Sequence, residues 1–332
     1  MTIKWAVIGT GFISNKAIDG MKQSSGSELY SVFGRQPDLV SDFQARHSIP
    51  HGTTDLDAVL ADEAVDAIYI GLPNHMHHEV TIKAAKAGLA VLSEKSLTTT
   101  MDEADALLSA VSQSETFFVE GLMYLAHPLL QRFVEVLQDG RLGALRSING
   151  YYCANIWDVV NPKGMGTLYN LGCYPVSLLQ LTVQTMCAAE TFTDRQMQGF
   201  GNLSSDGTIC DAACSVRFGN GVLATLQSTD SYGTGNDFSV IGDNGILSFV
   251  TNPWQPVAGR STLKWSPFEG NVELIHVDDP FDAFYHQTKL VELHVSRGDR
   301  EAARPSPQHK DSWEIMDFLT SWEASCRAAG TT

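Results

Sequence analysis

A glycine-containing turn near the N-terminus places the strongest constraint on the fold. The apolar run Trp5–Ile8 leads directly into Gly9 and Gly11, and the small Ser14 stands three residues later. In a strand–turn–helix unit the first glycine permits the tight turn, and the second lets the backbone approach a pyrophosphate. A small third residue lets the helix pack close to the strand. Amide N–H groups at the helix N-terminus would then face the phosphates. The alternative is a plain strand-to-helix turn. The predicted dinucleotide contacts are Gly9, Gly11, Phe12 and Ile13.

The rest of the first 120 residues alternates short apolar runs with helical patterns. Ala104, Leu107 and Val111, for example, lie on one face of a helix. Strand runs without polar alternation, separated by helices, are typical of a parallel sheet that is covered on both faces. We therefore predict a doubly wound dinucleotide-binding Rossmann domain over residues 1–120. Its further apolar runs are 29–33, 67–71, 90–92 and 116–119.

The pattern changes after about residue 120. A helix is expected from Pro128 to about Asp139, and strand alternation follows it. The runs 214–218 and 222–226 flank Gly219-Asn220-Gly221, which predicts a hairpin, and a second hairpin is expected over 238–249. Two helical patterns, about 281–297 and 308–328, end the chain. We predict a mainly antiparallel α+β domain over residues 121–332, for substrate binding and oligomerisation.

Composition limits the partners. The chain has 332 residues, 43% of them hydrophobic, and a formal net charge of −16. A strongly acidic surface repels phosphate backbones and anionic lipids, so we expect no nucleic-acid and no membrane partner. No apolar run approaches the roughly 20 residues of a spanning helix, and the N-terminus lacks a signal-peptide layout. With six cysteines and no Cys-x-x-Cys pair, reduced thiols and a cytoplasmic location are expected.

The end of the second apolar run indicates which dinucleotide is bound. An acidic residue there hydrogen-bonds the ribose 2′-OH of NAD, whereas an arginine suits the 2′-phosphate of NADP. Here Gly34 and Arg35 follow Phe33, and the first acidic residue downstream is Asp38. We therefore predict NADP(H), with NAD(H) as the alternative cofactor and with contacts from Gly34 and Arg35. The alternative for Arg35 is a solvated charge at a strand end.

Four further motifs follow in order, at 72–77, 93–96, 120–128 and 164–175. Together they resemble the glucose–fructose oxidoreductase and inositol dehydrogenase family, known as Gfo/Idh/MocA, over nearly the whole chain. The resemblance implies a Rossmann domain followed by an open-faced sheet domain that often mediates dimer contact. It also implies hydride transfer between a nicotinamide and a sugar, keto-sugar or cyclic diol. The partners expected from it are a carbohydrate or polyol substrate and a second copy, in a homodimer or dimer of dimers through the C-terminal sheet.

The resemblance places the reaction on two side chains. Its Glu-Lys-Pro motif puts the active-site lysine on Lys95. Its second-domain motif puts the proton donor or acceptor on Tyr174, as in the glucose–fructose oxidoreductase-like and dihydrodiol dehydrogenase-like branch. Hydride addition to a carbonyl develops negative charge on oxygen, which needs a proton donor and an electrostatic stabiliser. A nearby ammonium lowers the pKa of a tyrosine, so the pair is chemically coherent.

Other positions follow from the same motifs. Asn170 completes the expected catalytic set. The remaining expected cofactor contacts are Leu72, Pro73, Asn74, His77, Glu94 and Lys95. The expected substrate contacts are Tyr124, Asn170 and Tyr174, together with Trp157, which lies outside these motifs. Substrate specificity is expected to lie in the loops around Tyr124, Trp157 and residues 230–236.

Three residues depart from the family pattern. Ser96 replaces the proline after the lysine, Asn170 replaces a frequent aspartate, and Leu125 replaces a frequent arginine. These departures leave an alternative open, namely a catalytically impaired, nucleotide-sensing regulatory protein of the same fold.

Two clusters invite other interpretations. His75, His77 and His78 look like metal ligands, but no Cys or Glu stands at a ligand spacing, and we predict no metal. A second, aromatic cluster could form a sugar-stacking wall, although core or dimer packing is the favoured interpretation. Its members are Trp254, Trp265, Phe268 and Phe281.

Overall fold

The computed structural model describes residues 2–161 and 164–330, and its contacts group the chain into two compact units. The first unit comprises Met1–Ala126 and Asp282–Lys310, and the second comprises His127–Phe281 and Asp311–Thr332. The chain therefore passes twice through each unit. Across the described residues, we find no helix with the length and apolar character needed to cross a membrane.

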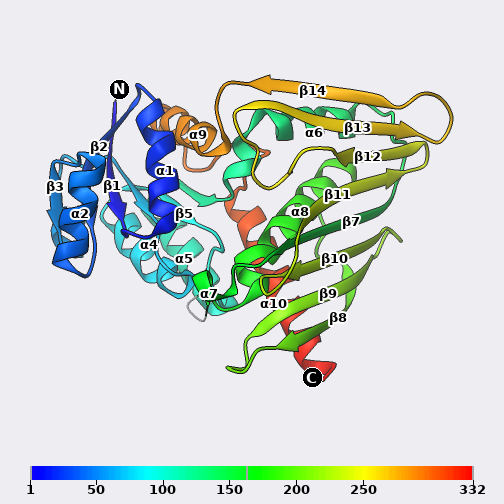
Figure 1. Cartoon of the computed structure of the whole chain (residues 1–332), viewed down its shortest axis with the longest axis horizontal. Helices are drawn as coiled ribbons and strands as arrows, with labels where there is room; N and C mark the ends of the chain where they lie inside the picture. Colours follow the sequence, from blue (N-terminus) through cyan, green and yellow to red (C-terminus); the bar gives the residue numbers. More distant parts are fainter. Residues whose placement is uncertain (1, 162–163, 331–332) are drawn as a thin grey trace. The chain divides into compact units, whose positions relative to one another are not determined.

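The first unit is built on a six-stranded sheet, ordered β3-β2-β1-β4-β5-β6, in which every pairing is parallel (Figure 1). This order is that of a doubly wound Rossmann sheet and confirms the predicted fold class. The strands are β1 (Ile3–Ile8), β2 (Ser27–Phe33), β3 (His51–Thr53), β4 (Ala67–Ile70), β5 (Ala90–Glu94) and β6 (Phe118–Gly121). The helices are α1 (Phe12–Gln23), α2 (Pro37–His47), α3 (Leu56–Leu60), η1 (Asn74–Met76), α4 (His77–Lys86), α5 (Met101–Ser114), η2 (Met123–Ala126) and α9 (Ala283–Arg297).

Helix α9 belongs to this first unit. Its Val291 is fully buried in the same cluster as Trp5 of β1 and Ile18 of α1. A Cβ on Gly20 of α1 would lie 2.6 Å from the backbone of Phe284, so the two helices touch backbone to backbone. The sequence pattern assigned this helix to the domain predicted over residues 121–332. In the structure its apolar face packs against the parallel sheet of the first unit.

The second unit is built on an eight-stranded sheet, ordered β14-β13-β12-β11-β7-β10-β9-β8. All pairings are antiparallel except β7 with β10, so the predicted mainly antiparallel sheet is confirmed. Both predicted hairpins are present, as β9–β10 and β11–β12. The strands are β7 (Leu145–Ala154), β8 (Arg195–Leu203), β9 (Ile209–Phe218), β10 (Leu223–Thr229), β11 (Thr234–Gly242), β12 (Gly245–Phe249), β13 (Gly259–Pro267) and β14 (Glu273–Asp279).

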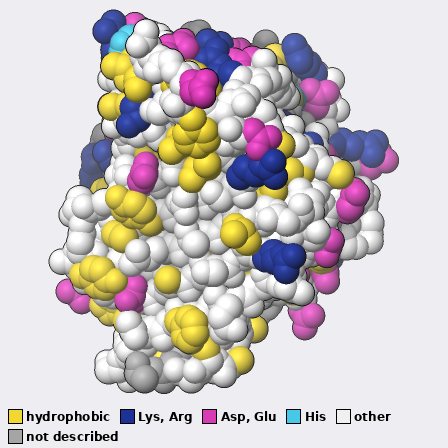
Figure 2. Space-filling view, turned by 90° about the vertical axis from the view of Figure 1, so that its right-hand side faces the viewer, with side chains coloured by type: hydrophobic (Ala, Val, Ile, Leu, Met, Phe, Trp, Pro, Cys, Tyr) yellow, Lys and Arg dark blue, Asp and Glu magenta, His cyan; other side chains and the backbone are white. Residues whose placement is uncertain are grey.

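Helices cover one face of this second sheet. They are α6 (Pro128–Gln138), η3 (Leu168–Gly172), α8 (Cys173–Met186) and α10 (His309–Ala328), and α8 and α10 run along the sheet in Figure 1. The short helix α7 (Trp157–Val160) follows β7 and buries none of its residues. Strand β9 shows the resulting alternation, since Cys214 and Val216 are buried while Ala213 and Ser215 are exposed. Figure 2 looks toward the side where these strands lie and shows separate hydrophobic groups, with basic and acidic groups scattered among them.

Candidate functional site

The turn after β1 has the close backbone contacts that a dinucleotide loop requires. Gly9 has a φ of +111°, and a Cβ there would lie 2.6 Å from the carbonyl oxygen of Gly71. Only glycine fits such a position. Gly71 in turn approaches Ser14 of α1, whose hydroxyl oxygen would lie 2.4 Å from a Cβ at residue 71. The small third residue of the motif thus brings the helix against the sheet.

The N-terminus of α1 fits a phosphate group. Gly11 is the N-cap residue, in an extended conformation, and contributes no side-chain cap. The first N–H groups of a helix need an acceptor from outside the helix, and an anion at this end is favoured by the helix dipole. Phe12, the first helical residue, is 71% exposed, and Ile13 is half-buried.

The end of β2 lies beside this turn. The amide of Gly9 donates to the carbonyl of Phe33 at 2.9 Å, which joins the two strand ends. Gly34 is buried, and a Cβ on it would lie 2.9 Å from Val40 and 3.1 Å from Thr10. The side chain of Arg35 is exposed at the same edge. Its position suits a contact with a group on the adenosine ribose.

The next segment, 72–77, is held by a buried histidine. The Nε2 of His77 lies 2.8 Å from the carbonyl of Leu72, and its Nδ1 lies 2.8 Å from the carbonyl of Ser96. His77 therefore joins the segments after β4 and β5. Burial lowers the pKa of His77 to about 4, so the ring is neutral near pH 7. A neutral imidazole carries one N–H, so one ring nitrogen donates to its carbonyl while the other packs against the second carbonyl. Leu72 and Pro73 are half-buried and Asn74 is buried.

Glu94 and Lys95 stand where β5 ends. Glu94 is buried and accepts a hydrogen bond from the hydroxyl of Tyr69 at 2.8 Å. Burial raises the pKa of Glu94 to about 7, against the opposing effects of the Lys95 charge and the Tyr69 hydrogen bond. Lys95 is half-buried, and the peptide bond between Lys95 and Ser96 is cis.

Sequence reasoning missed a supporting carboxylate in β6. Glu120 is buried, and its Oε1 accepts from the amide of Leu97 at 2.8 Å, two residues beyond Lys95. It therefore holds the segment that follows the predicted active-site lysine. The signal was present, because an acidic residue inside a buried strand needs a partner.

The second unit places Tyr174 in an aromatic cluster. Tyr174, in the first turn of α8, lies edge-on to Tyr152 with ring centroids 5.3 Å apart, and its centroid is 6.2 Å from that of Trp254. Trp254 is fully buried. It therefore packs in the core, as the favoured interpretation held, instead of forming a sugar-stacking wall. Gln255 donates to the hydroxyl of Tyr152 at 3.1 Å, and burial raises the pKa of Tyr152 to about 12.

Asn170 lies one turn before Tyr174, in the wide π-helical turn η3. Turns of this kind are frequent at functional sites. Its Nδ2 donates to Oδ2 of Asp230 at 2.8 Å and contacts Oδ1 of Asn161 at 3.0 Å. Sequence reasoning named residues 230–236 only as a loop and missed Asp230 and Asn161. No residue spacing marks this cluster, because Asp230 lies 60 residues beyond Asn170 in the chain.

The two remaining predicted substrate residues differ in accessibility. Trp157 begins the short helix α7 and is half-buried, whereas Tyr124, in η2, is fully buried. The structure thus gathers the predicted cofactor contacts at the carboxyl edge of the first sheet. In the second unit it gathers Asn170, Tyr174 and the segment that carries Trp157. Lys95 belongs to the first unit and Tyr174 to the second, and their pairing stays a prediction.

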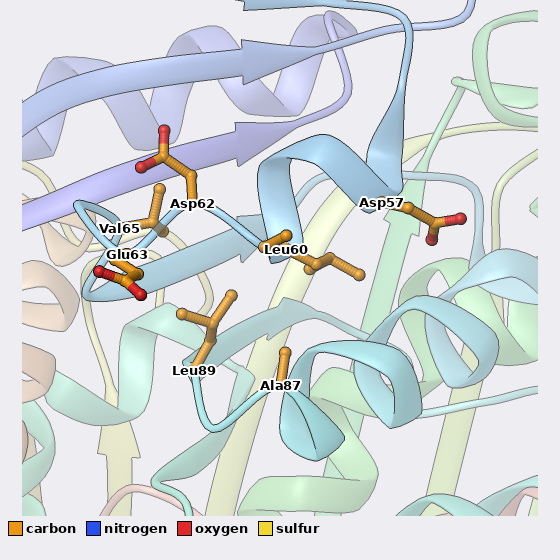
Figure 3. Close-up of a pocket in the computed structure, with 8 residues that line it drawn as sticks. Asp57, Leu60, Asp62, Glu63, Val65, Ala87 and Leu89 are labelled. Atoms are coloured by element: carbon orange, nitrogen blue, oxygen red, sulfur yellow. The ribbon is translucent and has the colours of Figure 1, made fainter.

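A cleft of about 440 Å³ lies at the opposite, amino-terminal edge of the first sheet. Leu60, Val65 and Leu89 lie between Asp57 at one end and Asp62 and Glu63 at the other (Figure 3). Three carboxylates oppose a phosphate-bearing ligand. This cleft is therefore distinct from the predicted dinucleotide loops, which follow the carboxyl ends of the strands.

Comparison with known proteins identifies the class to which this fold and these loops belong. Residues 3–121 match the model of an oxidoreductase family with an NAD-binding Rossmann fold, and residues 130–248 match the C-terminal domain model of the same family. The chain belongs to this family, GFO/IDH/MocA, as the motifs indicated. Its first unit is therefore a nicotinamide-dinucleotide-binding domain.

Individual relatives agree with this assignment. The chain is 30% identical to D-xylose 1-dehydrogenase (NADP+) 2 of Haloferax volcanii, over 54% of this chain and 57% of that protein. It is 23% identical to trans-1,2-dihydrobenzene-1,2-diol dehydrogenase of Xenopus laevis, over 78% of each. The chain thus spans only about half the length of its curated relatives at 30% identity or above.

A solved structure supports the fold. A 3-ketoreductase from Actinomadura kijaniata, in an open conformation with TDP-benzene and NADP, superposes with a TM-score of 0.84 over 98% of both chains, at 22% identity. At this identity the likeness concerns the fold.

Proposed function

We propose that this protein is an NADP(H)-dependent oxidoreductase that transfers a hydride between nicotinamide and a sugar, keto-sugar or cyclic diol. One observation carries the proposal. At a single edge of the first sheet, the Gly9 turn and the uncapped helix α1 suit a pyrophosphate, and Lys95 supplies an ammonium at the end of a nearby strand. The names of the xylose and dihydrodiol dehydrogenases support the substrate class.

The cofactor contacts follow from that edge. Backbone amides at Gly11, Phe12 and Ile13 bind the pyrophosphate, while Gly9 and Gly34 keep the turn open. Arg35 binds the 2′-phosphate, which makes NADP(H) the preferred form. The segment 72–77 and Glu94 complete the nicotinamide side, with His77 acting through the two backbone carbonyls that it holds. When bound, the nicotinamide supplies or accepts the hydride.

Tyr174 carries the proton and Lys95 carries the balancing charge. In reduction, the carbonyl carbon of the substrate gains the hydride, and the electron pair of the broken C=O π bond moves to oxygen. That oxygen takes the hydroxyl proton of Tyr174. The phenolate left behind is stabilised by the Lys95 ammonium. In oxidation the same proton returns to Tyr174, which acts as the general base.

Tyr152 and Trp254 hold the ring of Tyr174, so its hydroxyl has a fixed direction. Asn170, one turn earlier, orients a substrate hydroxyl, and the half-buried Trp157 completes the substrate contacts. Tyr124 is fully buried and is not proposed as one of them.

We also propose a homodimer, or a dimer of dimers, formed through the exposed face of the eight-stranded sheet of the second unit. A cytoplasmic location is proposed as well. This face carries the exposed Phe200 and Tyr151, and a groove of about 470 Å³ runs between them and the neutral side chains of β9 and β10. Neutral and aromatic side chains with few charges are typical of protein interfaces. All six cysteines lie in the described part of the chain, and none forms a disulfide.

The test is a panel of aldoses, keto-sugars, inositols and cyclic diols, each assayed in both directions with NADP(H) and NAD(H) by nicotinamide absorbance. We expect turnover of at least one sugar or cyclic diol, faster with NADP(H). Tight NADPH binding without turnover of any compound would contradict the enzyme and favour the nucleotide-sensing regulator. Mass measurement in solution tests the oligomer, and a Phe200→Glu variant should shift it to the monomer.

A further inference from the structure

Asp230 connects three segments of the second unit. It follows β10 directly, and its side chain is fully buried. Its Oδ2 accepts from Nδ2 of Asn161 and from Nδ2 of Asn170, each at 2.8 Å. A buried carboxylate that accepts charge-assisted hydrogen bonds is held more firmly than a neutral acceptor.

The same residue brackets helix α7. The backbone carbonyl of Asp230 accepts from the amide of Ile156 at 2.9 Å, just before the helix, and its carboxylate accepts from Asn161, just after it. Trp157 lies between these two attachment points. Asp230 therefore fixes both ends of the segment that carries this proposed substrate residue.

The carboxylate also fixes the direction of the Asn170 amide. The NH2 group must face Asp230, because the opposite orientation would set a carbonyl oxygen against a carboxylate. The Oδ1 of Asn170 then lies against Gly164, where a Cβ would approach it to 2.1 Å. Gly164 thus leaves room for the Asn170 amide, which a side chain at 164 would displace. The second contact of Asn170, to Oδ1 of Asn161, requires the same orientation.

These contacts explain why residue 170 is an amide. A second carboxyl group at 170 would stand about as close to Asp230 as the present 2.8 Å hydrogen bond, and the two groups could keep this distance only by sharing a proton. Two like charges at this distance, out of water, repel strongly. The cluster therefore accommodates one carboxylate and one amide, and in this chain the carboxylate is at position 230.

We propose that Asp230 is a positioning residue of the proposed active site, one that sets the Asn170 amide and the Trp157 segment for substrate. This inference rests on the proposed function, since it gives the site a substrate to orient. Asp230 acts through Asn170 and α7, and the dinucleotide-binding unit does not depend on it. Its loss should therefore affect substrate kinetics and leave the affinity for NADPH unchanged.

The first experiment requires no turnover and measures how firmly Asp230 holds the two ends of α7, which we call the Asp230 clamp. Hydrogen exchange of the peptide covering 156–161 is compared in wild-type protein and in Asp230→Ala, with a peptide from β4 as the internal reference. We expect exchange to rise about tenfold in 156–161 and to stay unchanged in β4. Unchanged exchange in 156–161 would overturn the clamp, whatever the protein catalyses.

The second experiment exchanges the charge. Asn170→Asp, Asp230→Asn and the double variant are assayed on the substrate that the panel identifies, and Kd for NADPH is measured by fluorescence. We expect Asn170→Asp to lower kcat/KM about 100-fold and the double variant to recover at least tenfold of it, with Kd for NADPH within about twofold throughout. A double variant no better than Asn170→Asp, or an Asp230→Asn variant with wild-type kcat and KM, would overturn the positioning role.

Asp243→Asn is the matched control. Asp243 also accepts from two donors, the guanidinium of Arg146 and the amide of Ala144, but it lies in the β11–β12 turn. Its kinetics should match those of the wild type. Wild-type protein that turns over no compound defeats the proposed function alone, because the exchange experiment still decides whether Asp230 clamps the segment.

Discussion

The two units hold their candidate residues by different means. In the first unit backbone contacts dominate, since Gly9 lies against the carbonyl of Gly71 and the His77 ring lies between two backbone carbonyls. In the second unit side chains hold one another, as in the cluster of Asp230 with Asn161 and Asn170. A site built from backbone tolerates little change of residue shape. A site built from side chains can keep its geometry while charge moves from one position to another.

The largest effect should come from the second unit. Replacing Tyr174 by Phe removes the hydroxyl that carries the proton and leaves the ring contacts with Tyr152 and Trp254. General acid–base groups contribute about 10²–10⁴-fold, and we expect kcat to fall by that factor. Affinity for NADPH should be unchanged, which steady-state kinetics and a fluorescence titration will measure together.

The control for this variant is Tyr152→Phe. Its hydroxyl bonds to Gln255 and has no part in the proposed reaction, so kcat should fall by less than about threefold. Full activity in Tyr174→Phe would show that another group carries the proton.

The next effect tests the backbone-built site. In Gly9→Ala a methyl group would meet the carbonyl oxygen of Gly71 at 2.6 Å, at a φ of +111° that side chains disfavour. We expect Kd for NADPH to rise about 100-fold or more and the thermal midpoint to fall.

Gly88→Ala separates these two causes. Gly88 also has a positive φ, of +80°, but nothing lies within 4 Å of the added methyl group. The unfolding free energy of this variant should fall by about 1 kcal/mol, which is the cost of a positive φ for alanine. Its affinity for NADPH should equal that of the wild type. Equal NADPH affinity in both alanine variants would contradict a close-approach role for Gly9.

The contrast between the units also explains what the sequence could predict. Parallel strands bring their carboxyl ends to one edge, so the positions of Gly9, Arg35 and Lys95 could be expected from the order of the runs alone. The antiparallel sheet and its hairpins were equally readable from the alternation. The partners of Asn170 were not, because Asp230 and Asn161 meet it through tertiary packing that follows no periodicity.

The same reasoning accounts for helix α9. Its apolar face gives no indication of which sheet it covers. Its burial against Trp5 and Ile18 depends on the whole course of the chain between residues 127 and 281.

A third effect concerns stability and pH. The pKa of Glu94 rises from its ordinary value of 4.5 to about 7 on folding, mainly through burial. The folded state therefore binds more protons than the unfolded state between these values, and stability falls as pH rises through that window. The rise in the pKa of Glu94 from 4.5 to about 7 corresponds to roughly 3 kcal/mol of unfolding free energy.

Glu94→Gln tests this linkage. The variant should lose the fall in unfolding free energy between about pH 4.5 and 7, as measured by denaturant titration at several pH values. Glu79 is an exposed residue in the first turn of α4 in the same unit. The Glu79→Gln variant should show the same dependence of unfolding free energy on pH as the wild type. Parallel pH profiles for the wild type and Glu94→Gln would contradict a raised pKa.

The smallest effect is expected at Arg35, a proposed cofactor contact that depends on an exposed side chain. Arg35→Ala should raise KM for NADPH about tenfold, equivalent to ~1.4 kcal/mol, and leave KM for NADH unchanged, because only NADPH carries the 2′-phosphate. Arg46→Ala removes an exposed arginine from α2 of the same unit and should change neither value. An equal rise for both cofactors would instead place the guanidinium on the adenine that they share. A wild-type preference for NADH of tenfold or more would refute the assignment of Arg35 to a phosphate. Either result would confine the proposed phosphate contacts to the backbone of the Gly9 turn.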